Sequence, residues 1–311
     1  MYSHVVNKLL VIGGTGLLGQ YVVLEATGRG WAVTATYHDS DEKLGTANLV
    51  HLDVRDENEV RHTINDLRPD FVILAGGLTD LDYCETHPQD AWAVNAEGTL
   101  NVAASCKLAN VPLMYISTDA IFNGEKGEHY YEFDTPDPQG IYAKTKLEGE
   151  RLTVDADYRN IVCRIATLYG WNRLAEKPNF ATWALGELRA GRPLDLYADR
   201  RSSPTYAPHC AKVLMTMIEH GARGIYHASG NECLDRYEMG LKVAEVFELD
   251  ASLCRRSTSD ESNTIARRGK NLCLSVQKTE GEFDLRMIKF EDGLRSMRST
   301  EPGTENGSEY F

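Results

Sequence analysis

A tyrosine and a lysine lie four residues apart in the segment from Gly140 to Glu150, at Tyr142 and Lys146. If the segment is helical, both side chains lie on one face. An ammonium group near a phenol favours the phenolate, which lowers the phenol pKa from about 10 toward a value suited to proton transfer with a ketone being reduced. The pair therefore predicts acid–base chemistry on a carbonyl group. Because this spacing is common, the prediction depends on the groups that the fold brings beside it.

The predicted strand Leu113–Ser117 ends in the hydroxyl of Ser117 and is followed by the hydroxyl of Thr118 and the carboxyl group of Asp119. In an open parallel sheet, ligands bind outside the carboxyl ends of the strands. We expect Thr118 to hold the carbonyl oxygen beside Tyr142, with Ser117 as the alternative. A purely structural role for Thr118, as a cap on the next turn, is the competing interpretation.

Three glycines, Gly13, Gly16 and Gly19, join a predicted strand to a predicted helix. Gly13 tolerates the tight turn, Gly16 lets the main chain approach a pyrophosphate, and Gly19 allows close packing of helix on strand. The phosphates then lie at the positive end of the helix. Because strand and helix flank the glycines, the pattern predicts a dinucleotide site, to which we also assign Thr15, Leu17 and Leu18.

The end of the second predicted strand bears on the choice between NAD and NADP. An acidic residue there binds the ribose 2′-hydroxyl of NAD and repels the 2′-phosphate of NADP. This strand ends in Thr36, Tyr37 and His38, followed by Asp39, with no arginine to pair with a phosphate. We therefore favour NADP(H) over NAD(H) and leave NAD(H) open because of Asp39. Tyr37 and His38 are expected near the adenine ribose.

The third predicted strand is followed by Asp53 and Val54, which we expect to contact the adenine. It is equally possible that Asp53 is only a polar residue at the end of a buried strand and has no contact with the adenine.

Short β-branched runs alternate with segments of helix length in the first half, which predicts a parallel sheet with helices on both faces. The expected strands are Lys8–Ile12, Ala32–Thr36, Leu49–Leu52, Phe71–Leu74, Leu113–Ser117 and Asn160–Ile165. The expected helices are Leu17–Thr27, Glu57–Leu67, Ala91–Ala109, Tyr142–Thr153 and Asn179–Ala190, with Gly191–Pro208 as a loop. The predicted class is α/β, a Rossmann-type doubly wound parallel sheet with a smaller α/β substrate-binding lobe.

We expect three regions along the chain. Residues 1–170 form the dinucleotide-binding domain, to which part of 210–230 returns, and residues 171–298 form mainly the substrate-binding lobe, built chiefly from 171–210 and 230–290. The tail 299–311 is rich in turn formers and charge, which predicts disorder.

Composition excludes several classes of protein. The apolar fraction of 42% and the net charge of −13 are those of a globular protein without a nucleic-acid surface. No stretch is long and apolar enough for a membrane span, so we expect a soluble cytoplasmic protein with no membrane partner. The seven cysteines are scattered and never spaced Cys-x-x-Cys, which predicts reduced thiols and no metal site.

Taken together, these motifs resemble the extended short-chain dehydrogenases, and among them the dTDP-4-dehydrorhamnose reductases, over residues 7–295. The resemblance rests on the glycine motif, Thr118, Tyr142 and Lys146, and on further stretches: Ala75-Gly76-Gly77, Val94-Asn95-Ala96, Phe122, Glu132-Phe133-Asp134, Arg164, Tyr169-Gly170, Asn179-Phe180-Ala181, Asp199 and Pro204 to Pro208. It implies hydride transfer to C4 of a 4-keto nucleotide sugar, a proton from Tyr142, and a bond from Lys146 to the nicotinamide ribose.

Further contacts follow from the resemblance. It adds Ala75, Gly76, Gly77 and Asn95 to the dinucleotide site. It also implies substrate contacts from Asp119, Phe122 and Asn179, to which we add Arg200 and Arg201 from their own chemistry. A homodimer is a further implication, and some family members hold magnesium on an acidic dimer surface.

Five positions named here depart from the family pattern, and they lie in the expected substrate wall. Ala120 replaces an aromatic residue and Thr167 replaces a tryptophan, both of which line the sugar pocket in the family. Arg200 and Arg201 replace part of an Asp-Gln-Phe-Gly segment, and Gly269 replaces a proline. The two arginines can clamp a diphosphate or can be solvated loop charges. The resemblance therefore implies a nucleotide sugar without fixing which one.

Other functions share this scaffold. Dehydratases carry Asp then Glu after the threonine, whereas Ala120 follows Asp119 here, which argues against dehydration. A sugar-nucleotide epimerase, which retains NAD through a closed redox cycle, stays open. So does a non-catalytic role like that of the regulatory β subunit of methionine adenosyltransferase, which resembles this chain as well.

Overall fold

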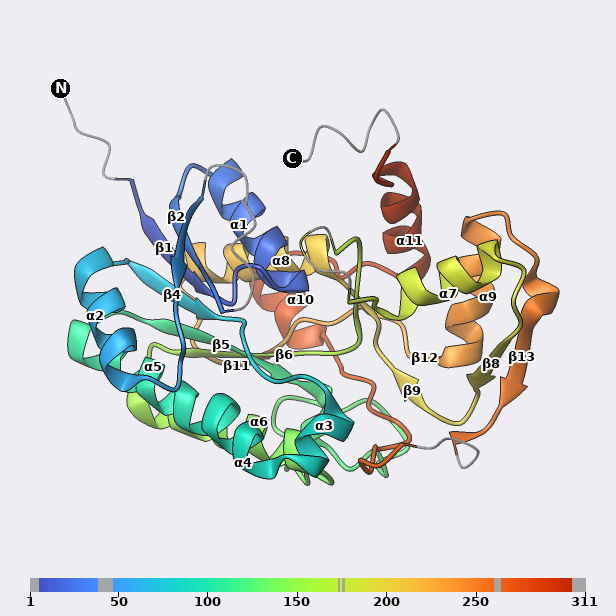
Figure 1. The fold of residues 1–311 in the computed structure, drawn as a ribbon, viewed down its shortest axis with the longest axis horizontal. Coiled ribbons are helices and arrows are strands. Elements are labelled where there is room, and N and C mark those ends of the chain that lie inside the picture. The colour runs from blue at the N-terminus through green and yellow to red at the C-terminus, as the bar shows by residue number, and fades with distance from the viewer. Residues whose placement is uncertain (1–5, 39–46, 173, 175–176, 260–263, 304–311) are drawn as a thin grey trace.

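The protein, described by a computed structural model over residues 6–38, 47–172, 174, 177–259 and 264–303, is built on one large sheet. Within these residues the sheet has seven parallel strands in the order β11-β6-β5-β4-β1-β2-β3 (Figure 1). The strands are β1 (Lys8–Ile12), β2 (Ala32–Tyr37), β3 (Asn48–His51), β4 (Phe71–Leu74), β5 (Leu113–Thr118), β6 (Ile161–Ile165) and β11 (Gly224–His227). The predicted fold class is confirmed.

Helices cover both faces of this sheet because its central strands are apolar on both sides. Every residue of β4, β5 and β6 is buried. One face carries α1 (Leu17–Gly28), α8 (Ala207–Glu219) and α10 (Gln277–Phe283). The other face carries α2 (Glu57–Leu67), α5 (Gly98–Ala109) and α6 (Ile141–Ala156).

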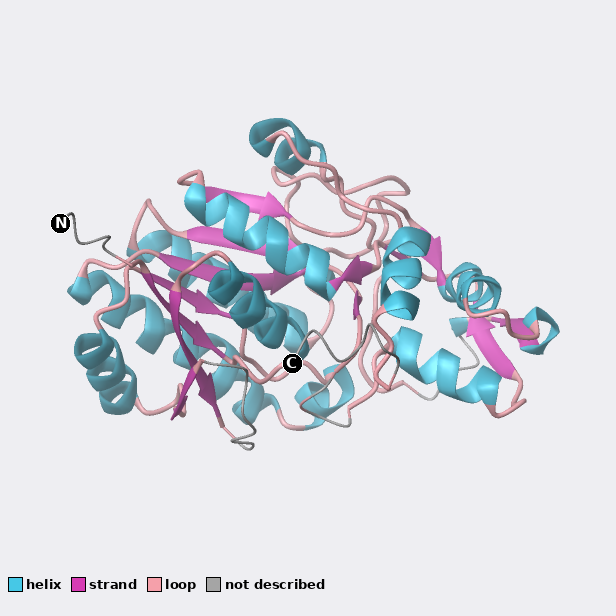
Figure 2. Cartoon of the chain, turned by 90° about the horizontal axis from the view of Figure 1, so that it is seen from above, coloured by secondary structure: helices cyan, strands magenta, loops and turns pink. Residues whose placement is uncertain are grey.

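The order of the strands determines where a ligand can bind. The chain builds β1, β2 and β3 outward in one direction and then returns to place β4, β5 and β6 on the other side of β1. A crevice forms at such a reversal, outside the carboxyl ends of β1 and β4. Figure 2 shows the strands running from the end of the molecule that holds the N-terminus toward its middle, where loops gather.

A second hydrophobic cluster forms the smaller lobe, at the right of Figure 1. It packs α7 (Phe180–Arg189), α9 (Arg236–Val246) and α11 (Phe290–Ser299) around short strands. Three two-stranded sheets complete the described part: β7 (Leu168–Tyr169) with β10 (Thr205–Tyr206), β9 (Arg201–Ser202) with β12 (Leu234–Asp235), and β8 (Leu194–Tyr197) with β13 (Cys254–Ser257). Phe283 and Met287, which the sequence assigned to this lobe, pack with the large sheet instead.

Two element predictions need correction. Gly191–Pro208 was predicted as a loop but contains β8, β9 and β10, because their partners are distant in the chain and leave no local signal. The predicted helix Ala91–Ala109 consists of α4 (Pro88–Trp92), a π-helical turn (Ala93–Glu97) and α5. Such turns often occur at functional sites.

Shorter elements fill the remaining connections. They are α3 (Leu81–Thr86) and two 3₁₀ turns, Asp119–Ile121 and Ala251–Leu253. No helix within the described ranges is long and apolar enough to cross a membrane. Asp39 and the tail residues 304–311 lie outside the described residues, so the predictions made for them stay predictions.

The cysteine prediction is wrong for two of the seven residues. Cys233 and Cys273, which are 40 residues apart in the chain, form a disulfide with their Cα atoms 5.4 Å apart. The other five cysteines are buried and free. Scattered spacing hid the pair because it is the fold, and not the local sequence, that brings the two residues within bonding reach.

Candidate active site

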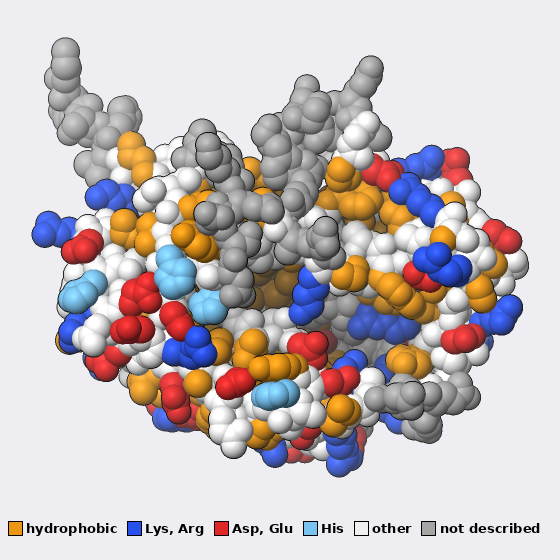
Figure 3. All heavy atoms as spheres, viewed as in Figure 1, with side chains coloured by type: hydrophobic (Ala, Val, Ile, Leu, Met, Phe, Trp, Pro, Cys, Tyr) orange, Lys and Arg blue, Asp and Glu red, His pale blue; other side chains and the backbone are white. Residues whose placement is uncertain are grey.

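A pocket of about 640 Å³ lies at the predicted crevice, between the carboxyl ends of the sheet and the smaller lobe. Figure 3 shows the hollow between the two halves of the molecule, with basic side chains on its right-hand wall. Most predicted site residues line it: Gly13, Gly16, Leu17, Leu18, Ala75, Gly76, Gly77, Thr118, Asp119, Tyr142, Lys146, Asn179, Arg200 and Arg201.

The glycine loop is closely packed, and the amides of Gly13, Gly14 and Gly16 donate within the protein. Gly13 has a φ of +81°, and a Cβ there would lie 2.5 Å from the Cα of Gly76. A Cβ on Gly19 would overlap the backbone of Gly13 and Gly14. Helix α1 begins at Gly16 with no side-chain cap and no acidic residue in its first turn. These uncapped N–H groups fit the pyrophosphate of a dinucleotide.

Asn95 does not line the pocket, although the resemblance implied a dinucleotide contact. Its side chain accepts from the backbone N–H of Leu78 at 2.9 Å and donates to the carbonyl of Leu78 at 3.0 Å and to Thr145 at 3.2 Å. Asn95 therefore ties the loop after β4 to helix α6, and it positions the site without facing the pocket.

The predicted adenine-side residues lie around the ends of β2 and β3, beyond the pocket lining. Asp53 is paired with Arg55 at 2.6 Å and lies 3.7 Å from His38. The hydrogen bond from Arg55 lowers the pKa of Asp53 to about 2. The ring of Tyr37 meets His51 edge-on, and the carbonyl of Val54 accepts a hydrogen bond from Asn101.

Thr15 and Phe122 also lie outside the pocket lining. Phe122 is only 1% exposed, and its ring stacks on Tyr130 with 4.1 Å between the ring centres. It therefore belongs to a buried cluster behind the substrate wall, which does not support the direct substrate contact that the resemblance implied.

Helix α6 brings Tyr142 and Lys146 to the pocket. The helix starts at Gly140, and a carboxylate from α3, that of Glu85, accepts from the N–H of Ile141 at 3.0 Å. The ammonium of Lys146 donates to the carbonyl of Ile116 at 2.7 Å and lies 4.0 Å from the centre of the Tyr115 ring.

The pKa values of the pair differ from the prediction. Burial lowers the pKa of Lys146 to about 7, against the opposing charge of Glu150. Burial also raises the pKa of Tyr142 well above its usual range, with partial opposition from the hydroxyl of Thr118. The expectation that Lys146 lowers the phenol pKa is wrong, because desolvation dominates and the ammonium is bonded to Ile116.

A buried ion pair between Glu150 and Arg164 supports Tyr142 and Lys146 from behind the pocket. Glu150, one turn after Lys146 on α6, accepts from Ser117 at 2.5 Å and pairs with Arg164 of β6 at 2.8 Å. The side chains of Arg164 and Glu150 are 2% and 4% exposed. The Ser117 hydroxyl is thus committed to Glu150. The Thr118 hydroxyl caps the next 3₁₀ turn, as the competing interpretation expected, by accepting from the N–H of Ala120 at 3.2 Å, and Thr118 also lines the pocket. Sequence reasoning assigned no role to Glu150, although its place one turn after Lys146 on the same helix face was an available signal.

A chain of polar side chains leads from Thr118 into the smaller lobe. Thr118 donates to Asp119 at 3.1 Å, and Ser202 donates to the other oxygen of Asp119 at 3.1 Å. Ser202 in turn lies 2.8 Å from the hydroxyl of Thr167. Burial raises the pKa of Asp119 to about 6, partly offset by the hydrogen bonds from Thr118 and Ser202.

Thr167, the position where the family has tryptophan, has a φ of +27°. Positive φ is rare for a β-branched residue and marks a strained backbone. Arg236 lies beside it, with a guanidinium nitrogen 3.4 Å from its hydroxyl. The wall that is aromatic in the family is therefore small and polar in this chain.

Five arginines line the pocket, and three of them, Arg200, Arg236 and Arg268, lie close enough to interact electrostatically. Burial lowers the pKa of Arg236 to about 10; the negative charge of Asp119 opposes this shift, and repulsion from Arg268 and Arg200 adds to it. Within the described residues, the buried Nε atoms of Arg200 and Arg268 make no hydrogen bond. Another nitrogen of Arg268 pairs with Asp82 at 3.2 Å. The buried donors that lack acceptors fit an anionic ligand.

Arg201 behaves differently from its neighbour. It donates to the carbonyl of Cys233 at 2.6 Å and pairs with Glu238 at 3.2 Å. Its charge is therefore already engaged within the smaller lobe, so of the two predicted arginines only Arg200 has a buried donor without an acceptor among the described residues. The sequence did not identify Arg236, because α9 is distant in the chain and carries no local motif.

Comparison with known proteins agrees with this geometry. The family model described as RmlD substrate binding domain matches residues 7–301. The probable low-salt glycan biosynthesis reductase Agl14 of Haloferax volcanii is 30% identical over 290 residues, covering 93% of this chain and 96% of that protein. Methionine adenosyltransferase 2 subunit beta of Bos taurus is 30% identical over 280 residues, covering 88% and 82%.

Among solved structures, the dTDP-4-dehydrorhamnose reductase of Bacillus anthracis str. Ames in complex with NADP superposes with a TM-score of 0.85. The match covers 94% of this chain and 99% of that chain, at 23% identity. At this identity the likeness shows a shared fold.

Proposed function

Since this chain belongs to the family of the RmlD substrate binding domain, we propose that it is an NAD(P)H-dependent reductase of a 4-keto nucleotide sugar. The observation that carries the proposal is the convergence, in one pocket, of an open helix N-terminus, the Thr118–Tyr142–Lys146 group and an arginine cluster. These three parts suit a dinucleotide, a carbonyl group and a diphosphate.

The glycine loop and the N-terminus of α1 would hold the dinucleotide, with Gly76 and Gly77 on its other side. When bound, the dinucleotide supplies hydride for the carbonyl carbon. We propose NADP(H) as the preferred form for two reasons. Strand β2 ends at Tyr37 and is followed by His38, and neither carries the acidic side chain that would repel the 2′-phosphate of NADP. In addition, the carboxylate of Asp53 is held by Arg55.

Tyr142 would protonate the substrate oxygen. A phenol whose pKa is raised by burial keeps its proton at neutral pH, which is the form needed to donate to a reduced carbonyl. The hydroxyl of Thr118, which donates to Asp119 in this structure, would turn its O–H to the same oxygen when substrate binds, and Asp119 would keep its hydrogen bond from Ser202. Lys146, anchored on Ile116, lies where it can bond a ribose hydroxyl of the dinucleotide and orient it.

The arginine cluster would take the diphosphate of the substrate. Arg200 and Arg268 each present a buried Nε without an acceptor in the described structure, and Arg236 lies close enough to repel both. A dianion between them would relieve this repulsion and satisfy the donors. This arrangement accounts for a cluster of positive charge within a protein of net charge −13.

A regulatory protein is the second candidate, because the bovine methionine adenosyltransferase subunit matches at the same 30% identity as the Haloferax reductase. Ala120 and Thr167, which differ from the reductase pattern, leave room for such a role. The presence of Thr118, Tyr142 and Lys146 in one pocket favours catalysis.

The test is oxidation of NADPH and of NADH, followed by absorbance, with a dTDP-4-keto-6-deoxyhexose as acceptor. Tyr142→Phe should lower kcat by roughly 10²- to 10⁴-fold, the usual contribution of a positioned acid, without changing the Kd for NADPH. Tyr158→Phe is the matched control, because Tyr158 is 75% exposed, and should keep full activity.

Two outcomes would contradict the proposal. Tight dinucleotide binding without turnover of any 4-keto nucleotide sugar would favour the regulatory role. Interconversion of nucleotide sugars with retained NAD and no net oxidation would indicate an epimerase.

A further inference from the structure

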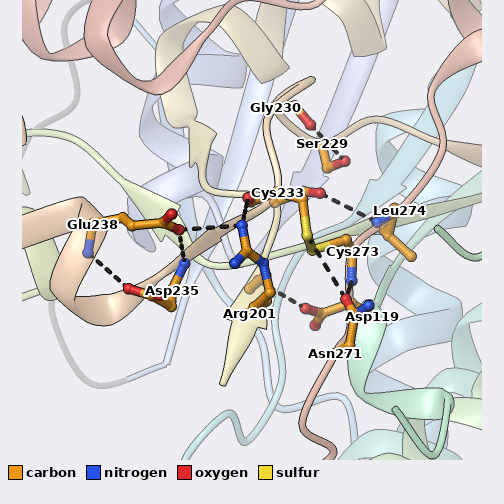
Figure 4. Close-up of a disulfide and its surroundings, with 12 residues drawn as sticks. Asp119, Arg201, Ser229, Gly230, Cys233, Asp235, Glu238, Asn271, Cys273 and Leu274 are labelled. Atoms are coloured by element: carbon orange, nitrogen blue, oxygen red, sulfur yellow. Dashed lines mark hydrogen bonds and ion pairs between the residues drawn. A yellow bond between two sulfur atoms is a disulfide. The ribbon is translucent and has the colours of Figure 1, made fainter. Parts of the chain in front are cut away.

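The disulfide lies at one end of the substrate wall. Residues 266–269 and Leu272 line the pocket and carry two of its arginines, Arg267 and Arg268. This wall segment ends at Cys273, whose sulfur is bonded to Cys233 at the entrance to strand β12. The bond therefore ties the wall segment covalently to the smaller lobe, as Figure 4 shows.

Arg201 connects both ends of this tie to the pocket. Its backbone N–H donates to the carbonyl of Lys270 at 2.7 Å, and its own carbonyl accepts from the N–H of Leu272 at 3.0 Å. Its guanidinium donates to the carbonyl of Cys233 at 2.6 Å. Strand β9 is thus held between the two segments that the disulfide joins (Figure 4).

The next residue of β9 carries this connection to the polar chain beside the candidate catalytic group. Ser202 donates to Asp119 at 3.1 Å, and Asp119 accepts from Thr118 at 3.1 Å. A shift of the wall segment or of Cys233 is therefore passed to β9, and from there to the position of Asp119. The glycine loop and α6, in contrast, are held by the large sheet.

The two cysteines differ in exposure. Cys273 is fully buried, whereas Cys233 is only partly buried and follows the exposed Asn231 by two residues. A thiolate from solvent would therefore approach the bond from the Cys233 side, and exchange depends on such access.

We propose that Cys233–Cys273 is a thiol–disulfide exchange site, and that its redox state sets the position of the substrate wall. In its oxidised form the protein binds the nucleotide part of its substrate more tightly than in its reduced form, with the same affinity for the dinucleotide. The identity of the ligand rests on the proposed function.

The exchange needs a dithiol as reductant or a small disulfide as oxidant. In reduction, a thiolate of the dithiol attacks the Cys233 sulfur, the bond between the two cysteines breaks, and the Cys273 sulfur leaves and takes a proton. The second thiol of the reagent, as thiolate, then attacks its own mixed-disulfide sulfur and releases Cys233. The protein gains two electrons and two protons, and the reagent becomes a disulfide.

The experiment compares the full chain after treatment with glutathione disulfide and after treatment with dithiothreitol. Peptide mapping by mass spectrometry reports the Cys233–Cys273 bond, and calorimetry gives Kd values for dTDP, UDP and NADPH. We expect the Kd for the preferred nucleotide to rise about threefold or more on reduction, as when the binding-competent fraction falls to a third. The Kd for NADPH should not change.

Variants separate the disulfide from general effects of thiol reagents. Cys233→Ser and Cys273→Ser should bind nucleotide as the reduced wild type does, in the presence and absence of dithiothreitol. Cys106→Ser removes a buried free thiol beneath the other face of the sheet and should respond like the wild type. If the serine variants fail to fold, the comparison of oxidised and reduced wild type is sufficient.

Either of two results would overturn the proposal. The first is equal nucleotide affinity in the oxidised and reduced proteins, with the Cys233–Cys273 bond found by peptide mapping only in the oxidised one. The second is that Cys233 and Cys273 stay free thiols after exposure to glutathione disulfide. A protein that binds NADPH but neither dTDP nor UDP in either state would instead overturn the proposed function, and this inference with it.

Discussion

Replacing Lys146 by methionine should stabilise the protein at low pH while it removes a candidate catalytic group. Lys146 is 6% exposed, and burial lowers its pKa from 10.5 to about 7. A lysine with a lowered pKa in the folded state binds fewer protons there than in the unfolded chain. Its penalty on stability is therefore fully present below about pH 7, and it is relieved as the pH rises from the folded toward the unfolded pKa.

The two pKa values set the size of the effect. Between pH 6 and pH 9, linkage with pKa values of about 7 and 10.5 gives a change of about 2 to 3 kcal/mol in the contribution of this one group to the free energy of unfolding. Methionine fills a similar volume and does not titrate. The stability advantage of Lys146→Met over the wild type should thus be larger at pH 6 than at pH 9 by this amount.

Urea unfolding of both proteins at the two pH values, under constant redox conditions, measures the difference. Lys144→Met is the control, because Lys144 lies on the same helix with an exposed side chain. Its effect on stability should be small and the same at both pH values. A Lys146→Met advantage that is equal at pH 6 and pH 9 would refute the assignment of Lys146 as a buried, destabilising charge.

Two further predictions concern charged groups. Glu150→Gln leaves the buried guanidinium of Arg164 without its carboxylate and should lower the free energy of unfolding by about 3 to 5 kcal/mol. Urea unfolding measures this loss, and a loss below about 1 kcal/mol would show that the ion pair contributes little to stability. Arg200→Ala should raise the KM for the nucleotide sugar by roughly 10- to 100-fold, the usual worth of a charge-assisted hydrogen bond, and should leave the Kd for NADPH unchanged. Arg192→Ala, at a largely exposed arginine paired with Glu187, is the control, and an equal KM in both variants would exclude Arg200 from the substrate site.

Much of the sheet was predictable from the sequence because its strands are short apolar runs between turn formers. Strands Lys8–Ile12 and Phe71–Leu74 were predicted with the bounds that the structure has. The placement of the glycine loop, Thr118 and Tyr142 around one pocket follows from the rule that parallel strands present their carboxyl ends to the same crevice.

The features that sequence reasoning missed depend on contacts between distant segments. The pKa of Tyr142 is set by burial within the assembled pocket, which the spacing of Tyr142 and Lys146 does not report. Arg236 reaches the wall from α9, and Cys233 meets Cys273 across 40 residues. In each case the decisive neighbour is remote in the chain, so no local pattern carries the information.

The two halves of the pocket come from different parts of the chain, and this bears on how such proteins diverge. The groups placed for proton transfer come from β5 and α6 of the large sheet, whereas Arg200, Arg236 and the wall segment come from later parts of the chain. Selection can therefore rewrite the recognition surface while the reactive half keeps its geometry. Thr167 is a position in this later wall where such a change would be visible, and grafting the later wall of a relative onto this sheet offers a route to engineered sugar specificity.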